Sequence, residues 1–431
     1  MTRKDIGVGL LGLGVVGSGV VEVLRNKENR FAEQIGTSLV LKRVLVQNIN
    51  RQRRVKLDRH LLTGQVKDIV NDPAVDIVIE LIGGEHPATE YIRQAIAAGK
   101  HVVTANKEVI AKHGPELLSL AREHGVELRY EASVGSGIPL ISPFQQDLAA
   151  NDISAVYGIL NGTTNYILTR MAQDGLDFAA ALKQAQKLGY AETNPANDIE
   201  GTDTAYKLAI LSNLAFHARF DPRDIYCEGI SRLQAQDFRY AQEFGYSIKL
   251  LAIAKLDGNT VEMRVHPVFI PQDSQLAKVE GVYNAIQIES DLAGRIIFYG
   301  EGAGAFRATS AILSDTLVIA KNVSLGIGNV REVLLNQKLD IKPMGDLETR
   351  YYFRLNVSDR PGVLAQISRV LGDNSISISS VIQKESDRIA QTAVLVVMTH
   401  PAQERCVQAA LKQLEQLTVV NEVSNFIRVE G

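Results

Sequence analysis

The chain lacks the features that would point to secretion, membrane insertion or nucleic-acid binding. It has only two cysteines, Cys227 and Cys406, which have no metal-ligand spacing, so we expect small core residues in a reducing cytoplasm. No apolar run is long enough to cross a bilayer, and the N-terminus lacks a signal-peptide pattern. A formal net charge of −3 gives no overall attraction to nucleic acid or anionic membranes. We therefore predict a cytoplasmic protein with neither partner.

The length of 431 residues predicts two or three domains. In the first third, short apolar strands alternate with helical patterns, which is typical of a doubly wound parallel sheet. Strands are expected at 6–11, 39–46, 76–82, 101–104 and 127–130, and helices at 15–24, 88–98 and 115–123. We predict an α/β Rossmann dinucleotide-binding domain over residues 1–134.

The pattern changes after Val134. Residues 135–321 predict an α+β domain with its own core, which includes a helical pattern at about 307–321. Residues 322–348 have no strong helical or strand periodicity of hydrophobic residues and are expected to be a linker. Residues 349–431 follow the order βαββαβ, which predicts a ferredoxin-like domain.

A glycine motif follows the first predicted strand and opens a helix. Gly12, Gly14 and Gly17 allow a tight turn whose N–H groups approach a pyrophosphate. In this context the motif predicts a dinucleotide site. No acid follows the second strand until Asp58, which favours NADP over NAD. Four basic residues come instead and either bind a 2′-phosphate or form a solvated loop: Arg51, Arg53, Arg54 and Lys56.

The segment from Gly189 to Lys207 concentrates four acids: Glu192, Asp198, Glu200 and Asp203. Crowded carboxylates repel one another, so they need a cation, which is a metal ion, a lysine or the ammonium group of a ligand. Asp203 and Lys207 are four residues apart in a predicted helix and share one face. A surface ion pair is the alternative for these two residues. Glu200 is the acid most easily explained as structural.

Three further motifs lie where chain direction changes. Lys107 follows the fourth strand, at the sheet edge that faces the ligand crevice in such folds. The glycine-rich turn after Glu131 either holds a monovalent cation through its carbonyls or is an ordinary loop. The polar segment 161–165 either caps a helix or binds a carboxylate.

Together these motifs resemble homoserine dehydrogenases with a C-terminal ACT domain, in order and over essentially the whole chain. The most specific match is 188–207, with others at 105–107, 131–135, 158–165 and 359–364. Gln47 and Asn48 depart from the Arg-Asp of many members, and 304–309 lacks their Pro-Thr. The resemblance implies NAD(P)-dependent interconversion of L-aspartate 4-semialdehyde and L-homoserine, in threonine, methionine and isoleucine biosynthesis. It also implies that residues 135–321 form the homoserine-binding, catalytic and dimerisation domain, with the helix at about 307–321 returning to the Rossmann domain, and that residues 349–431 are a regulatory ACT domain.

The resemblance also implies roles for individual residues. The catalytic residues would be Lys107 and Lys207, in an order that the sequence leaves open. The substrate would contact Glu192, Asp198, Asp203 and Lys207. The dinucleotide would contact Gly12, Gly14, Val15, Val16, Gly17, Gly83, Lys107 and Gly304. A sodium ion would bind the backbone carbonyls of Glu131, Val134, Ser136 and Ile138. An amino-acid effector, expected to be L-threonine, would bind Asp359, Gly362, Val363, Leu364 and Asn374.

A unit as small as the ACT domain buries little surface alone, so a homodimer or homotetramer is expected. Two other functions compete with this interpretation. A catalytically inactive amino-acid sensor would have lost a lysine or the acids, and none is lost. Another ACT-bearing dehydrogenase would need a catalytic histidine with an acid partner, which the sequence pattern does not indicate.

Overall fold

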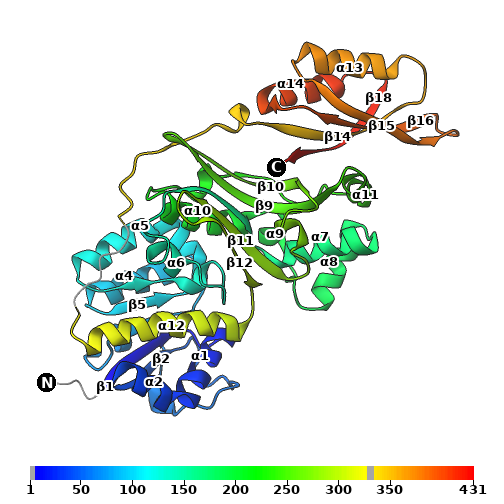
Figure 1. Cartoon of the computed structure of the whole chain (residues 1–431). Helices are drawn as coiled ribbons and strands as arrows, with labels where there is room; N and C mark the ends of the chain where they lie inside the picture. Colours follow the sequence, from blue (N-terminus) through cyan, green and yellow to red (C-terminus); the bar gives the residue numbers. More distant parts are fainter. Residues whose placement is uncertain (1–4, 328–333) are drawn as a thin grey trace. The chain divides into compact units, whose positions relative to one another are not determined.

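The computed structural model describes residues 5–327 and 334–431 (Figure 1). The chain forms two compact units. The first contains residues 1–156, 206–222 and 288–338, and the second contains 157–205, 223–287 and 339–431. No helix within the described ranges is both long enough and apolar enough to cross a membrane.

The first unit contains a six-stranded sheet in the order β3-β2-β1-β4-β5-β6. All its pairings are parallel, which confirms the predicted Rossmann architecture. The strands are β1 (Asp5–Leu11), β2 (Ser38–Leu45), β3 (Leu62–Thr63), β4 (Ile77–Glu80), β5 (His101–Thr104) and β6 (Leu128–Arg129). The carboxyl ends of these strands therefore meet at one edge, where ligands bind in such folds.

The helices of this unit are α1 (Val15–Asn26), α2 (Glu28–Ile35), α3 (Lys67–Val70), α4 (Ala88–Ala97), α5 (Lys107–Glu123), α6 (Ile141–Gln145) and α12 (Ala305–Ser324). The predicted start of a helix at Pro115 is wrong, because α5 begins at Lys107 and contains this proline. Asn106 provides the earlier start by accepting a hydrogen bond from the Val109 N–H at 3.2 Å.

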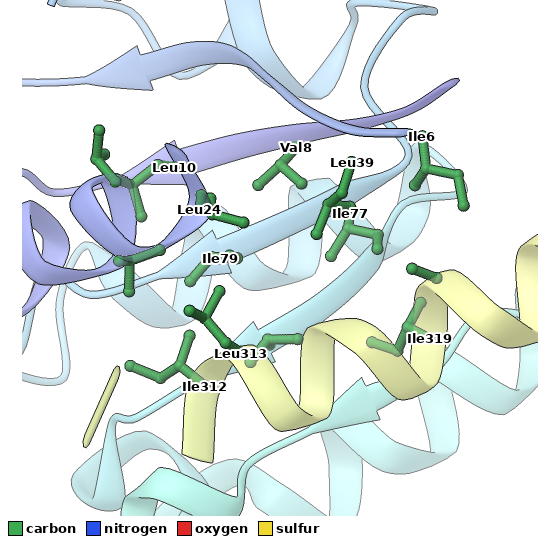
Figure 2. Close-up of a cluster of buried hydrophobic side chains, with 14 of the residues drawn as sticks. Ile6, Val8, Leu10, Leu24, Leu39, Ile77, Ile79, Ile312, Leu313 and Ile319 are labelled. Carbon is green, nitrogen blue, oxygen red and sulfur yellow. The ribbon is translucent and has the colours of Figure 1, made fainter. Parts of the chain in front are cut away.

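Helix α12 packs into the core of this sheet although it lies far along the chain. Ile312 and Ile319 of α12 are fully buried among Ile6, Val8 and Ile77 of the strands (Figure 2). Burying this apolar surface stabilises the unit by about 25 cal/mol per Å². The first unit therefore includes a helix that follows residues 157–205 and 223–287 of the second unit, the part of the chain that contains the acid run and is called the substrate region.

The second unit is built around a long hairpin of β9 (Tyr246–Asp257) and β10 (Thr260–Pro271), with Gly258 in the turn at φ +60°. Its other elements are α7 (Gly162–Asp174), α8 (Phe178–Lys187), α9 (Ala196–Ile199), β8 (Tyr226–Cys227), α11 (Ala235–Glu243) and β13 (Asp340–Ile341). The chain passes between the units within β7 (Ile153–Ile159), α10 (Thr202–Ala215) and β11 (Tyr283–Ser290). Strand β12 (Gly294–Glu301) belongs to the first unit, and neither β11 nor β12 was expected from the sequence.

The C-terminal part of the second unit has the predicted ferredoxin-like order. Its elements are β14 (Glu348–Ser358), α13 (Val363–Asp373), β15 (Ile378–Asp387), β16 (Thr392–Thr399), β17 (Ala402–Gln403), α14 (Glu404–Leu414) and β18 (Val420–Val429). Both helices cover the same face of the sheet (Figure 1). Ile367 of α13 and Val407 of α14 are fully buried against Tyr351 and Val397.

Strand β18 also pairs in parallel with β10, through Val268 with Arg428 and Phe269 with Val429. The C-terminal sheet therefore continues into the sheet of the substrate region. The predicted linker 322–348 lies partly outside the described residues, and within it β13 pairs with β10. The C-terminal domain is consequently held by sheet pairing as well as by its connecting segment.

Candidate functional site

The turn between β1 and α1 leaves an open cradle for a phosphate group. Gly12 has φ +98°, and a Cβ on it would lie 2.7 Å from the Leu81 carbonyl oxygen. A Cβ on Gly17 would lie 2.3 Å from the Gly12 carbonyl oxygen, whereas one on Gly14 would meet nothing within 4 Å. The first N–H groups of α1, at Val15 and Val16, follow this open position. These residues fit a dinucleotide pyrophosphate.

A buried carboxylate that the sequence did not reveal supports the neighbouring strand ends. Glu80 ends β4 and is fully buried; it accepts hydrogen bonds from Thr104 Oγ1 and the Ile82 N–H, each at 2.6 Å. Burial raises the pKa of Glu80 above its ordinary value. Gly83 follows at φ +80°, a conformation that favours glycine. Glu80 therefore fixes the backbone beside the cofactor crevice.

Lys107 is the first residue of α5, at the carboxyl end of β5. Asn106 precedes it and uses both ends of its amide group. Its oxygen caps α5, and its Nδ2 donates to the Gly84 carbonyl at 2.7 Å. The Asn106 N–H donates to Thr104 Oγ1 at 3.0 Å. The strand ends thus fix the point from which Lys107 projects.

The loop after β2 carries positive charge that is not used in ion pairs. Arg53 donates to the Arg51 carbonyl at 2.8 Å and also to the Asn48 carbonyl. In the part of the chain that the structure describes, none of Arg51, Arg53, Arg54 and Lys56 forms an ion pair. The charged groups of Arg51, Arg54 and Lys56 therefore remain available to an anion, whereas the Arg53 guanidinium is bound to the loop backbone.

The turn after β6 is organised by the side chain of Glu131. Its carboxylate accepts hydrogen bonds from the N–H groups of Leu140, Ile141 and Ser142 at 2.5, 2.9 and 2.8 Å. Its own N–H donates to Asp315 Oδ2 at 2.8 Å. Burial raises the pKa of Asp315 to about 7. The carboxylate of Glu131 is thus committed to the backbone, leaving its carbonyl as the possible cation ligand.

The three other predicted cation ligands lie in a tight turn. Ser136 has φ +55°, and a Cβ on Gly135 would lie 2.6 Å from the Ile138 carbonyl oxygen. Among the described residues, the carbonyls of Val134, Ser136 and Ile138 accept no hydrogen bond. Unsatisfied backbone oxygens are suitable ligands for a hard cation. These residues fit a monovalent ion.

Two members of the acid run are joined by an amide that the sequence analysis did not assign to the site. Asn161 Nδ2 donates to Asp198 Oδ1 at 2.7 Å and to Asp203 Oδ2 at 2.9 Å. Asn161 Oδ1 accepts from the Thr164 N–H at 2.9 Å, which caps α7. The polar segment before α7 was the available signal. Asn161 therefore holds two carboxylates side by side.

The other two acids of the run behave differently. Glu192 is exposed, and its carbonyl accepts from Gln186 Nε2 at 3.2 Å. Glu200 is also exposed, and its carbonyl accepts from Cys227 Sγ at 3.2 Å. The prediction that Cys227 is a core residue is wrong, because Cys227 is exposed, whereas Cys406 is partly buried and packs against the core of the C-terminal domain. No group of three or more His, Cys, Asp or Glu suited to a metal ion occurs in the described ranges.

Helix α10 carries Asp203 and Lys207 one turn apart. Both side chains are almost fully buried, with exposed fractions of 3% and 8%. Buried charges require polar partners, so a solvated surface ion pair is excluded for these residues. The helix thus presents a carboxylate and an ammonium on one face.

Gly304 precedes α12 at φ +131°. A Cβ on it would lie 2.7 Å from the guanidinium of Arg307, which pairs with Glu301. The glycine therefore lets the arginine lie across the start of α12. The backbone conformation at φ +131° is what requires glycine at this position, and the predicted contact of Gly304 with the dinucleotide remains a prediction.

The predicted effector residues do not gather at one place within a chain. Gly362 caps α13 at φ +88°, next to Val363, and Asp359 and Leu364 flank it. Asn374 ends the same helix and donates to the Val370 carbonyl at 2.8 Å. An α-helix of this length separates its ends by about 16 Å. Within one chain Asn374 therefore lies at the opposite end of α13 from the turn, and its predicted role in the effector site remains a prediction.

A Rossmann sheet with an open phosphate cradle, joined to a substrate region and a ferredoxin-like domain, defines a nicotinamide-dependent oxidoreductase with a C-terminal ACT domain. Family models match in the same order. Residues 12–131 match the homoserine dehydrogenase NAD-binding domain, residues 139–317 match homoserine dehydrogenase, and residues 351–419 match the ACT domain.

Full-length relatives agree. Homoserine dehydrogenase of Synechocystis sp. is 43% identical, covering 98% of this chain and 99% of its own, and that of Bacillus subtilis is 37% identical, covering 99% of each. The crystal structure from Thiobacillus denitrificans has a TM-score of 0.91 at 41% identity, covering 99% of this chain and 98% of its own. That from S. aureus has a TM-score of 0.78 at 32% identity, covering all of both chains. The chain belongs to the homoserine dehydrogenase family, oxidoreductases that act on CH–OH groups.

Proposed function

We propose that this enzyme interconverts L-homoserine and L-aspartate 4-semialdehyde with the carboxylates of Asp198 and Asp203 binding the substrate ammonium. The observation that carries this assignment is the amide of Asn161, which holds both carboxylates side by side. A shared ammonium would relieve their mutual repulsion. The exposed Glu192 is a further substrate ligand in this proposal.

The proton chemistry falls to the two lysines. A bound nicotinamide dinucleotide supplies or accepts the hydride. Reduction of the aldehyde develops negative charge on its oxygen, which Lys207 would stabilise and protonate. Lys107, projecting from the strand edge beside the cofactor crevice, would orient the substrate. In the direction of oxidation, Lys207 would take the hydroxyl proton.

NADP is the preferred dinucleotide in this proposal because uncommitted guanidinium groups follow β2. Replacing Arg51 and Arg54 together by Ala should lower kcat/KM for NADP⁺ about ten-fold, since a hydrogen bond to a charged group contributes about 1.5–3 kcal/mol. The value for NAD⁺ should stay within two-fold, as should both values in the control Arg30→Ala on α2. Equal losses with both dinucleotides would contradict the assignment.

The carbonyls of Glu131, Val134, Ser136 and Ile138 would hold a sodium ion, whose charge would stabilise the turn after β6.

The ACT turn at Asp359–Leu364 offers N–H groups at the start of α13 for the carboxylate of L-threonine. Strand β15 ends the sheet, and its outer edge can pair with a second chain, which favours a homodimer or homotetramer. Threonine inhibition would place the enzyme in threonine, methionine and isoleucine biosynthesis.

One assay tests these assignments together: homoserine-dependent reduction of NADP⁺ and NAD⁺, with sodium or a large organic cation, and with or without L-threonine. We expect faster turnover with NADP⁺, dependence on sodium and inhibition by millimolar threonine. Unchanged activity across millimolar threonine would exclude the regulatory role, and unchanged activity without sodium would exclude the cation.

A further inference from the structure

A cavity of about 600 Å³ lies within the second unit, away from the ACT turn at Asp359–Leu364. One wall comes from Glu200 and the loop Cys227–Leu233 of the substrate region. The other comes from α14 and from residues 423–427 of β18. Cavities of roughly 300–1,000 Å³ commonly bind small molecules.

The lining combines both signs of charge with an apolar floor. Arg232, Lys412, Glu200 and Glu415 are exposed residues of the lining, and in the described ranges none of these four side chains forms an ion pair. The buried floor consists of Leu233, Leu411 and Ile427, with the half-buried ring of Phe426 beside them. A ligand that satisfies all three features carries a carboxylate, an ammonium and an apolar side chain.

We propose that this cavity binds a free α-amino acid with an apolar side chain. Its carboxylate would pair with Arg232 and Lys412, its ammonium would pair with Glu200 and Glu415, and its side chain would cover Phe426. The site is separate from the threonine site at the ACT turn.

The walls of the cavity connect directly to the substrate carboxylates. Cys227 Sγ donates to the Glu200 carbonyl, and the Ile230 N–H donates to the Ile199 carbonyl at 3.0 Å. On the other side, Glu228 pairs with Arg428 of β18 at 2.9 Å. Asp198 and Asp203 flank Ile199 and Glu200 in the chain. A ligand that moves the loop therefore changes the position of these acids and the affinity for homoserine.

Isothermal titration calorimetry on the full-length protein tests the site directly. L-Isoleucine, L-valine and L-methionine are the probes, and N-acetyl-L-isoleucine and L-isoleucine methyl ester each lack one charge. We expect at least one amino acid to bind at millimolar concentration or below. Its affinity should fall at least ten-fold in Arg232→Ala and Lys412→Ala but stay unchanged in the control Arg369→Ala, on the exposed face of α13.

No binding of the three amino acids, equal binding of the two derivatives that lack one charge, or binding unaffected by either cavity substitution would overturn the proposal. Kinetics test the coupling, which rests on the proposed substrate site. The bound amino acid should change KM for homoserine by about 5-fold or more, within the usual range of allosteric coupling. An unchanged KM would overturn the coupling. Calorimetry needs no turnover, so loss of binding is distinguishable from failure of the proposed catalytic mechanism.

Discussion

At the scale of single residues, Asn161 is the side chain that joins two carboxylates of the acidic segment. Its amide donates to two carboxylates, and its oxygen caps α7. Without the amide, Asp198 and Asp203 would lose their shared donor and separate. The position of the acids therefore depends on a residue that carries no charge itself.

Replacing Asn161 by Ala should raise KM for homoserine at least about ten-fold, because hydrogen bonds to charged groups contribute about 1.5–3 kcal/mol. The substitution also removes a helix cap. Asp177→Ala is the matched control, since Asp177 caps α8 by accepting from the Ala180 N–H at 2.7 Å and touches neither acid. Steady-state kinetics on both variants should show the KM change in Asn161→Ala alone. Similar KM values in the two variants would assign only a capping role to Asn161.

Asp315 gives a pH-dependent stability with a defined sign. Its pKa is raised to about 7 in the folded protein, so the folded state binds the proton more tightly than the unfolded state does. The stabilisation that this proton provides is present at acidic pH and declines as the pH rises from the unfolded pKa of about 4 to about 7.

Asp315→Asn keeps an acceptor for the Glu131 N–H and removes the buried charge. We expect its Tm to exceed that of the wild type by a few degrees at pH 8, and the difference to shrink at pH 5. Thermal melts at the two pH values measure this. A difference that is the same at both pH values would contradict a titrating Asp315.

At the scale of elements, the glycines of the β1–α1 turn have two different roles: Gly17 allows close packing of the backbone, and Gly14 leaves space for a phosphate. Gly17→Ala should destabilise the protein, because its Cβ would overlap the Gly12 carbonyl oxygen at 2.3 Å. Gly14→Ala should fold normally, because the space around it is open and its φ of −81° suits alanine. It should weaken dinucleotide binding by occupying the cradle. Thermal melts and dinucleotide titrations on both variants test this, and a Gly14→Ala protein with normal affinity would exclude the cradle.

The helices and strands also show that local patterns can be predicted from the sequence, whereas contacts between distant segments cannot. The glycine turn, the ACT order and the Asp203–Lys207 spacing are local patterns, and each could be predicted. The bonds from Glu80 to Thr104 and from Asn161 to Asp198 and Asp203 join distant parts of the chain, so periodicity gave no sign of them. Pro115 favours a helix boundary in the sequence, but the cap at Asn106 starts α5 at Lys107 and the helix continues through this proline.

At the scale of the whole molecule, the ACT domain is joined to the substrate region by a buried polar network. Arg354 of β14 donates to Asp237 of α11 at 2.7 Å, and both side chains are almost completely buried. Tyr352 and Asn425 also donate to Asp237, at 3.1 and 2.8 Å. With the β10–β18 pairing, this network predicts that both parts unfold together.

Asp237→Ala should destabilise the protein by about 3–5 kcal/mol, because it leaves the Arg354 guanidinium buried without its partner. The control Asp373→Ala removes one partner of the exposed Arg369–Asp373 pair and should cost no more than about 1 kcal/mol. Differential scanning calorimetry of the wild type should show no separate transition for the ACT domain. A separate ACT transition, or equal effects of the two substitutions, would contradict this coupling.

The most direct test of the central claim is homoserine-dependent NADPH formation by the wild type, Lys207→Ala and Lys183→Ala. Lys183 is an exposed lysine of α8 and serves as the control. The account predicts robust activity in the wild type and the control, and a kcat about 10²–10⁴-fold lower in a folded Lys207→Ala protein, the usual contribution of a general acid–base. Near-normal turnover by Lys207→Ala would contradict the account.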